Sequence, residues 1–169
     1  MLPKRFGKYG LTLHPKKTRL IPFRRPPRGP KPARNKRPGT FDLLGFTHYW
    51  GKLQRGTWVV MRRTMKSRLT RAVRSFADWC RRARHQPIRE QRVMLVRKLR
   101  GHYNYYGITG NSQALGRLLF AVYCVWKKWL SRRNQRGMSW ERFEKLRKRA
   151  ALPEPRIMHR TLIVANTVT

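Results

Sequence analysis

The chain has 169 residues, of which 42 are Lys or Arg and 6 are Asp or Glu, so the formal net charge is +36 at pH 7. A compact protein with this charge repels itself, and a polyanion relieves the repulsion. The composition therefore excludes an ordinary enzyme of small neutral metabolites and favours a nucleic-acid partner. Binding should be tight and strongly weakened by salt, because Lys and Arg release counterions from phosphates. Ribosomal proteins and histones share this description, so charge indicates only the class of partner.

The apolar content argues against a disordered basic tail. Hydrophobic residues make up 40% of the chain, which also has 6 Trp, 6 Tyr and 7 Phe. Disordered chains contain few large aromatic residues, so we expect a packed core under a basic surface. The length suits one domain, or a small domain with an appended piece.

Cysteine usage and the N-terminus bear on location. Cys80 and Cys124 lie in apolar, helix-like contexts, which favours buried free thiols over zinc ligands. The N-terminal sequence MLPKRFGKYG lacks the apolar segment of a signal peptide. No apolar run approaches the roughly 20 residues of a membrane span. These patterns predict a cytoplasmic protein with no membrane partner.

The first predicted elements, in chain order, are two short strands and a loop. The segments 11–13 and 20–23 alternate in polarity around a turn at His14–Pro15, which predicts a strand on each side. Residues 24–39 contain five Pro, two Gly and seven Lys or Arg, so they cannot form a helix or a central strand. We expect an exposed basic loop there, either a solvated linker or a direct RNA contact.

A β-hairpin is predicted over residues 41–62. FDLLGFTHYW at 41–50 is apolar and aromatic, with Gly45 as a bend or a point of close approach. LQRG at 53–56 supplies a turn, and residues 57–61 have the composition of a second strand.

From residue 64 the apolar residues recur at helical spacing. Pro87 and the pair Gly107 and Gly110 separate three helices, and a short fourth helix should begin after an N-cap at Ser139 and end before Pro153. The three apolar stripes comprise Met65, Leu69, Ala72, Val73, Phe76, Cys80 and Ala83; Ile88, Leu95, Leu99, Tyr103 and Tyr106; and Leu115, Leu118, Leu119, Val122, Trp126, Trp129 and Leu130. The predicted fold class is mainly α (α+β), with short N-terminal β-hairpin elements followed by a bundle of three to four helices.

Five sequence motifs occur in a fixed order along the chain. They are GLTLHPKKTRL at 10–20, FDLLGFTHYW at 41–50, LRGHYNYYGITGN at 99–111, KKWLSRRNQRGMSWERF at 127–143 and LPEPRIMH at 152–159. In order and spacing they resemble the end of the palm, the primer grip and the maturase-specific domain (domain X, or thumb) of group II intron reverse transcriptases. The resemblance covers roughly residues 6–160.

This resemblance implies a division of the chain. Residues 1–62 would be a palm remnant with a primer-grip-like hairpin and the basic loop 24–39. Residues 63–160 would be the maturase-specific helical domain, or thumb, and residues 161–169 a frayed tail. Residue by residue, Lys17 matches the palm lysine near the incoming nucleotide, and Leu44, Gly45 and Phe46 match the primer-grip turn. The thumb signature is matched by Arg100, His102, Tyr103, Asn104, Tyr105 and Tyr106.

The carboxylates that the family uses for polymerisation are missing from this sequence. Phosphoryl transfer by two metal ions needs closely spaced carboxylates, and the family places them in a Tyr-Ala-Asp-Asp motif and an earlier Asp. Here the only aspartates are Asp42 and Asp78, far apart and in other contexts. We therefore expect no catalytic residues, no metal site, no cofactor and no polymerase activity of the chain by itself.

The expected RNA contacts are basic side chains on the helices, which would position the protein on phosphates without reading sequence. They are Arg97, Lys98, Arg100, Lys127, Lys128, Arg132 and Arg133, with Lys16, Lys17 and Arg19 in the N-terminal segment. Tyr105 lies off the apolar stripe, so a role in stacking on an RNA base and a merely solvent-exposed side chain are equally good interpretations.

Several other side chains favour structural roles. Tyr103 and Tyr106 lie on the apolar stripe and should belong to the core, as should Trp126 and Trp129. His102 should make a structural hydrogen bond. Asp78 and Glu90 flank arginines and should form ion pairs.

Three functions stay open from sequence. The first is an RNA-binding maturase-type domain of a group II intron-encoded protein, whose partner is group II intron RNA or another structured RNA. The second is a piece of a split RNA-directed DNA polymerase, contributing primer grip and thumb to an upstream palm chain and contacting an RNA–DNA duplex. The third is an inactive remnant of a mobile element.

Overall fold

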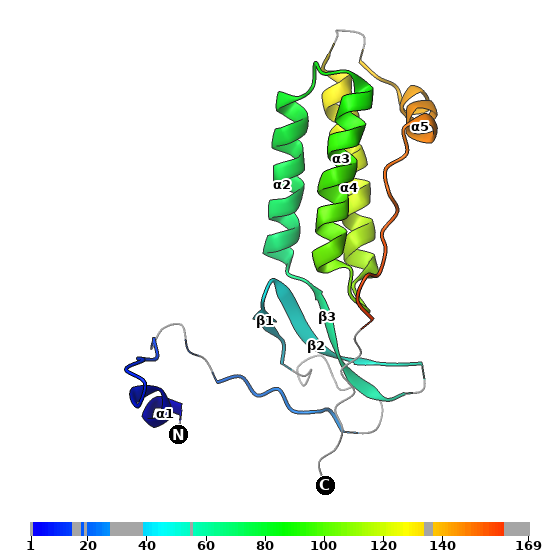
Figure 1. The fold of residues 1–169 in the computed structure, drawn as a ribbon. Helices are drawn as coiled ribbons and strands as arrows, with labels where there is room; N and C mark the ends of the chain where they lie inside the picture. The colour runs from blue at the N-terminus through cyan, green and yellow to red at the C-terminus, as the bar shows by residue number, and fades with distance from the viewer. Residues whose placement is uncertain are drawn as a thin grey trace.

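The computed structural model describes residues 2–14, 18, 20–27, 39–54, 56–133 and 137–160. In these ranges a three-stranded antiparallel sheet is followed by a set of helices, which confirms the predicted mainly α (α+β) fold class (Figure 1). The elements in chain order are α1 (Leu2–Gly7), β1 (Phe41–Leu43), β2 (Phe46–Lys52), β3 (Trp58–Thr64), α2 (Lys66–Arg82), α3 (Ile88–Tyr106), α4 (Ser112–Ser131) and α5 (Trp140–Arg149).

The sheet has the strand order β1-β2-β3, so the predicted hairpin is confirmed as β2–β3 and β1 adds a third strand. The bend predicted at Gly45 is a complete chain reversal between β1 and β2. Its two central residues, Leu44 and Gly45, have φ angles of 50° and 83°. Positive φ at both positions gives the turn whose twist matches that of antiparallel strands. Leucine rarely adopts this conformation, so the surrounding contacts must hold Leu44 in place.

The two strands predicted within residues 1–23 are wrong. Residues 11–14 and 20–27 have no regular secondary structure, and the helix in this part of the chain is α1 at residues 2–7. Pro22 cannot donate to a strand ladder, and an isolated two-stranded hairpin is marginal in water. The alternating pattern of residues 20–23 therefore does not lead to strand pairing.

An aromatic anchor attaches this segment to the sheet. The Phe23 ring stacks on Trp50 with 5.3 Å between ring centroids, and it meets Phe41 edge-on at 4.8 Å. The Trp58 indole N–H donates a hydrogen bond of 3.1 Å to the carbonyl of Pro27. The N-terminal segment thus packs on the sheet through side chains.

Helices α2, α3 and α4 lie side by side and enclose the main core (Figure 1). The stripes predicted from periodicity supply it, and Tyr103 and Trp126 are buried as expected, with Tyr106 and Trp129 packed against the core. Gln91 is a buried polar residue within this core, and the helical periodicity of apolar residues does not predict it. Its side chain accepts a 2.8 Å hydrogen bond from the Trp126 indole and donates to the carbonyls of Ala83 and Gln86 at 2.9 and 2.8 Å. It therefore ties α4 to the turn between α2 and α3.

Helix α5 begins as predicted, because the Ser139 hydroxyl accepts a 3.3 Å hydrogen bond from the Arg142 N–H. The helix ends at Arg149, before Pro153. The chain then runs back along the bundle toward the sheet (Figure 1). Along this path the Tyr123 hydroxyl accepts a 2.9 Å hydrogen bond from the Leu152 N–H, and the Tyr103 hydroxyl donates to the carbonyl of Pro153 at 3.2 Å.

A buried asparagine joins the sheet to the bundle. Asn111 accepts a 2.8 Å hydrogen bond from the N–H of Thr64, the last residue of β3. Its amide also donates to the Thr64 hydroxyl and to the carbonyl of Tyr106, both at 2.8 Å. Buried polar groups stay buried only when they are paired in this way, so the sheet and α3 are held in one fixed arrangement.

Two smaller expectations have mixed outcomes. Both cysteines are free, but only Cys80 is fully buried, where desolvation raises the pKa of its thiol to about 12, and Cys124 is half-buried. The ion pairs expected of Asp78 and Glu90 do not form between described residues, where the pair present joins Arg147 and Glu144 at 3.1 Å. Within the described ranges, no helix combines the length and the apolar character needed to cross a membrane.

Candidate RNA-binding surfaces

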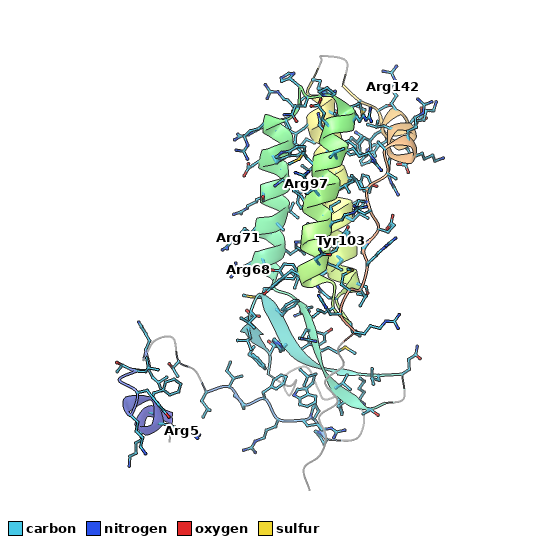
Figure 2. All side chains as sticks on the ribbon, viewed as in Figure 1. Arg5, Arg68, Arg71, Arg97, Tyr103 and Arg142 are labelled. Atoms are coloured by element: carbon cyan, nitrogen blue, oxygen red, sulfur yellow. The ribbon has the colours of Figure 1, made fainter. Side chains whose placement is uncertain are left out.

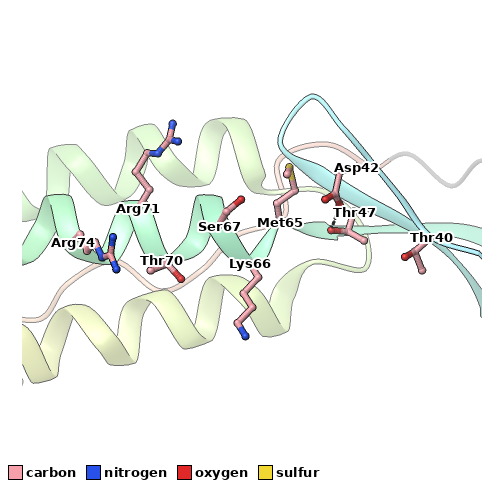
Figure 3. Close-up of a pocket in the computed structure, with 9 residues that line it drawn as sticks. All are labelled: Thr40, Asp42, Thr47, Met65, Lys66, Ser67, Thr70, Arg71 and Arg74. Atoms are coloured by element: carbon pink, nitrogen blue, oxygen red, sulfur yellow. Dashed lines mark hydrogen bonds between the residues drawn. The ribbon is translucent and has the colours of Figure 1, made fainter. Parts of the chain in front are cut away.

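A basic cleft lies where the β1–β2 turn region meets the start of α2 (Figure 3). It has a volume of about 740 Å³. Cationic and hydroxyl side chains dominate its lining, which comprises Thr40, Asp42, Thr47, Met65, Lys66, Ser67, Thr70, Arg71 and Arg74.

Local sequence explains the charge of this cleft. The residues Lys66, Thr70 and Arg74 are spaced by four, so they lie on one face of α2. Met65, at the N-cap position, makes no side-chain capping hydrogen bond, and the first turn of α2 has no acidic residue. The positive end of the helix dipole is thus not compensated by a local carboxylate.

The lone acid of the cleft is already engaged, since the Asp42 carboxylate accepts a 2.5 Å hydrogen bond from the Thr47 hydroxyl (Figure 3). Lysine, arginine and hydroxyl groups around a helix N-terminus form the donor set that binds phosphate oxygens. Figure 2 shows Arg68, which does not line the cleft, projecting outward from α2 beside Arg71, so the basic surface continues beyond the cleft.

The primer-grip-like residues Leu44, Gly45 and Phe46 dock directly on the end of α3. The Tyr105 hydroxyl donates a 2.9 Å hydrogen bond to the carbonyl of Leu44, and its ring stacks on Phe46 at 5.8 Å. A Cβ at position 45 would lie 3.0 Å from the Tyr106 hydroxyl, so only glycine fits without displacing it. The two motifs that the sequence separates by about sixty residues are therefore one structural unit.

Tyr105 is 54% exposed in spite of these contacts. His102 does not make the expected structural hydrogen bond through Nε2, which is buried and has no hydrogen-bond partner among the residues that the structure describes. Its ring stacks on Tyr106 at 4.4 Å instead. Burial lowers the pKa of His102 to about 4, so the ring is neutral at pH 7 and adds no charge to the surface.

On α3, Arg97 and Arg100 are exposed, as a phosphate contact requires. Lys98 is half-buried, with its ammonium 5.9 Å from the Phe76 ring centroid. Figure 2 places Arg97 at mid-height of the bundle, whereas Tyr103 is on the same helix nearer the sheet.

The basic residues at the end of α4 alternate with tryptophans. The Lys127 ammonium lies 4.4 Å from the Trp140 ring, and the Arg132 guanidinium lies 5.1 Å from Trp129, where Lys128 also approaches to 5.9 Å. Arg133 has a different role, because its guanidinium donates to the carbonyls of Arg84 and Gln86 and so supports the turn between α2 and α3.

The predicted cations therefore do not form one cluster. Arg97 and Arg100 lie along α3, and Lys127, Lys128 and Arg132 lie at the far end of α4. Lys16, Lys17 and Arg19 fall outside the described residues, as does most of the basic loop. The α2 cleft was missed from sequence, although the missing N-cap and the absence of acid in the first turn of α2 were available signals.

The comparisons cover family models, curated proteins and solved structures. None of them matches this chain. In the part of the chain that the structure describes, no group of three or more His, Cys, Asp or Glu side chains is arranged to hold a metal ion.

Proposed function

We propose that the chain is an RNA-binding, maturase-type domain that acts in the cytoplasm, holds group II intron RNA in its splicing-competent fold and leaves the chemistry to the RNA. The observation that carries the proposal is the basic cleft at the start of α2 beside the docked primer-grip-like turn. Six acidic residues are far too few to neutralise 42 cations, so a large phosphate-bearing partner is needed to do so.

The five ordered motifs support the choice of intron RNA over a generic polyanion. Two of them, the turn at Leu44–Phe46 and the signature around Tyr105, are in contact through a hydrogen bond of 2.9 Å and a ring stack. Specificity for a folded RNA would come from its shape and its unpaired bases, since phosphate contacts carry no sequence information.

The test is a comparison of two RNAs across a salt series. The chain should bind a group II intron RNA more tightly than a ribosomal RNA fragment of equal length, and both affinities should fall with salt. The Lys127→Glu, Lys128→Glu double variant should bind less tightly and show a flatter salt slope with unchanged helix content. Equal affinity for the two RNAs at every salt concentration would reduce the protein to a generic polyanion binder.

A second function, one piece of a split reverse transcriptase, has one specific observation in its favour. Leu43 and Leu44, beside the primer-grip-like turn, are 52% and 75% exposed, and an upstream palm chain would cover such an apolar edge. In this case too, the purified chain alone should incorporate no nucleotide on a primed template. Robust incorporation by it would contradict both proposals.

A further inference from the structure

A second hollow lies on the side of α4 that faces α5. It is an open groove lined mainly by Gly116, Phe120, Tyr123, Trp140, Arg147 and Glu154. Gly116, Phe120 and Tyr123 are spaced by four and three on α4, so they form one stripe. Helix α5 supplies Trp140 and Arg147, and the returning chain after α5 supplies Glu154.

Two large aromatic rings in this groove are exposed to solvent. Phe120 is 70% exposed and Trp140 is 59% exposed, even though both sit on well-formed helices next to the core. The floor is also open, because a Cβ at Gly116 would have no atom within 4 Å. Exposed aromatic rings beside an unfilled space are the feature that a flat, apolar ligand group would complete.

The charged side chains near the groove indicate the chemical class of its flat ligand group. The Lys127 ammonium is 4.4 Å from the Trp140 ring, and Arg147 is 4.9 Å from the Tyr123 ring. Arg117 and Arg156 are exposed and directly follow the lining residues Gly116 and Pro155 in the chain. Lys127 on α4 and Arg147 on α5 therefore put a cation beside a ring of the groove on each helix, which complements the phosphates on either side of a nucleotide.

The carboxylate of Glu154 favours a base over a phosphate as the group that enters the groove. This exposed carboxylate forms no ion pair with another described residue, and it would repel a phosphate placed against it. The same carboxylate accepts hydrogen bonds from the amino groups of bases. The groove volume of about 220 Å³ is below the roughly 300–1,000 Å³ of pockets for drug-sized ligands, which suits a single ring system.

We propose that the groove between α4 and α5 is a stacking site for one unpaired base of the bound RNA, with Phe120 and Trp140 as the stacking surfaces. The inference rests on the proposed RNA-binding function and adds to it a distinct site, remote in sequence from the α2 cleft.

The experiment measures binding of a short single-stranded RNA that carries 2-aminopurine, and of the same RNA in a perfect duplex. Stacking quenches 2-aminopurine fluorescence, so the wild-type chain should quench the single strand and leave the duplex largely unquenched. Phe120→Ala should weaken single-strand binding about tenfold, the equivalent of about 1.4 kcal/mol, and relieve the quenching. Its duplex affinity and its salt slope should stay within twofold of wild type.

Tyr9→Ala is the matched control, because it removes another highly exposed ring, 78% exposed, from the N-terminal segment far from α5 (Figure 1). It should bind both RNAs like wild type. Phe120→Trp should keep the single-strand affinity, since it preserves a stacking surface.

Three outcomes would overturn the inference. If wild type binds RNA but Phe120→Ala keeps both its single-strand affinity and its quenching, the groove is not a base site, and the proposed function stands. An equal loss for single strand and duplex would assign Phe120 to the fold or to backbone contacts. A wild-type dimer in sedimentation that dissociates in Phe120→Ala would make the groove a contact between copies. If wild type binds none of these RNAs, the proposed function itself fails.

Discussion

Asn111 is the single side chain on which the junction between sheet and bundle depends most. Asn111→Ala removes the acceptor of the buried Thr64 N–H and the donor to two oxygens. Leaving buried polar groups unpaired costs about 1–3 kcal/mol for each group, so the variant should lose about 2–4 kcal/mol of unfolding free energy. Urea denaturation followed by circular dichroism measures it. Asn104→Ala, at an exposed position of α3, is the control, and a loss below about 0.5 kcal/mol at Asn111 would contradict this role.

His102 makes stability depend on pH in a defined direction. Burial lowers the pKa of His102 from 6.5 to about 4, so between these values the unfolded chain binds a proton that the folded chain does not. Unfolding free energy should therefore fall as the pH falls from about 6.5 to about 4. Burial and Arg62 also lower the pKa of His48, which adds to the same slope.

The measurement for His102 is a series of urea midpoints between pH 4 and pH 7. His102→Phe retains a ring for stacking on Tyr106 and cannot be protonated, so its slope should be smaller than that of wild type. An equal slope in His102→Phe would assign the pH dependence to other groups.

At the scale of the element, cations at the start of α2 should contribute more to RNA binding than cations at its end. Lys66→Glu with Arg71→Glu reverses two cations that line the cleft, and each lost phosphate contact should reduce the salt slope by about 1. Arg81→Glu with Arg82→Glu makes the same change of net charge at the exposed end of the same helix. Filter binding across a salt series compares the two. Equal losses would mean that only the net charge of the chain matters.

The helices were the elements that sequence could predict, because an apolar stripe at helical spacing is a local signal that packing then confirms. The stripe from Leu115 to Leu130 needs no knowledge of its partners. Strands were harder to predict. Residues 11–13 alternate in polarity as a strand does, but they pair with no strand in the described part of the chain. The α2 cleft depends on residues of the sheet, such as Asp42, lining the same hollow as residues of α2, such as Arg74, and periodicity does not encode this proximity. Gln91 and Asn111 were missed for the same reason, since a buried polar residue is recognised only with its partners.

At the scale of the whole molecule, salt should act in opposite directions on folding and on binding. A net charge of +36 destabilises the compact state through self-repulsion. Added salt screens the repulsion between charges farther apart than the Debye length, which is about 10 Å at 0.1 M. Raising salt from about 0.05 to 0.5 M should therefore raise the melting temperature of the free chain while weakening RNA binding. Differential scanning fluorimetry and filter binding in the same buffers provide the two readouts. A melting temperature that falls with salt would contradict the repulsion argument.

The hydrogen bonds of Asn111 to Thr64 and Tyr106 fix the geometry that the protein presents to an RNA partner. Helix α3 has 19 residues, so it is a rod roughly 28 Å long at 1.5 Å per residue. With one end of this rod locked to the sheet, the α2 cleft and the α4–α5 groove cannot slide relative to each other. Under the proposed function, the protein should therefore bind only RNA folds that place a phosphate backbone and an unpaired nucleotide at this fixed separation.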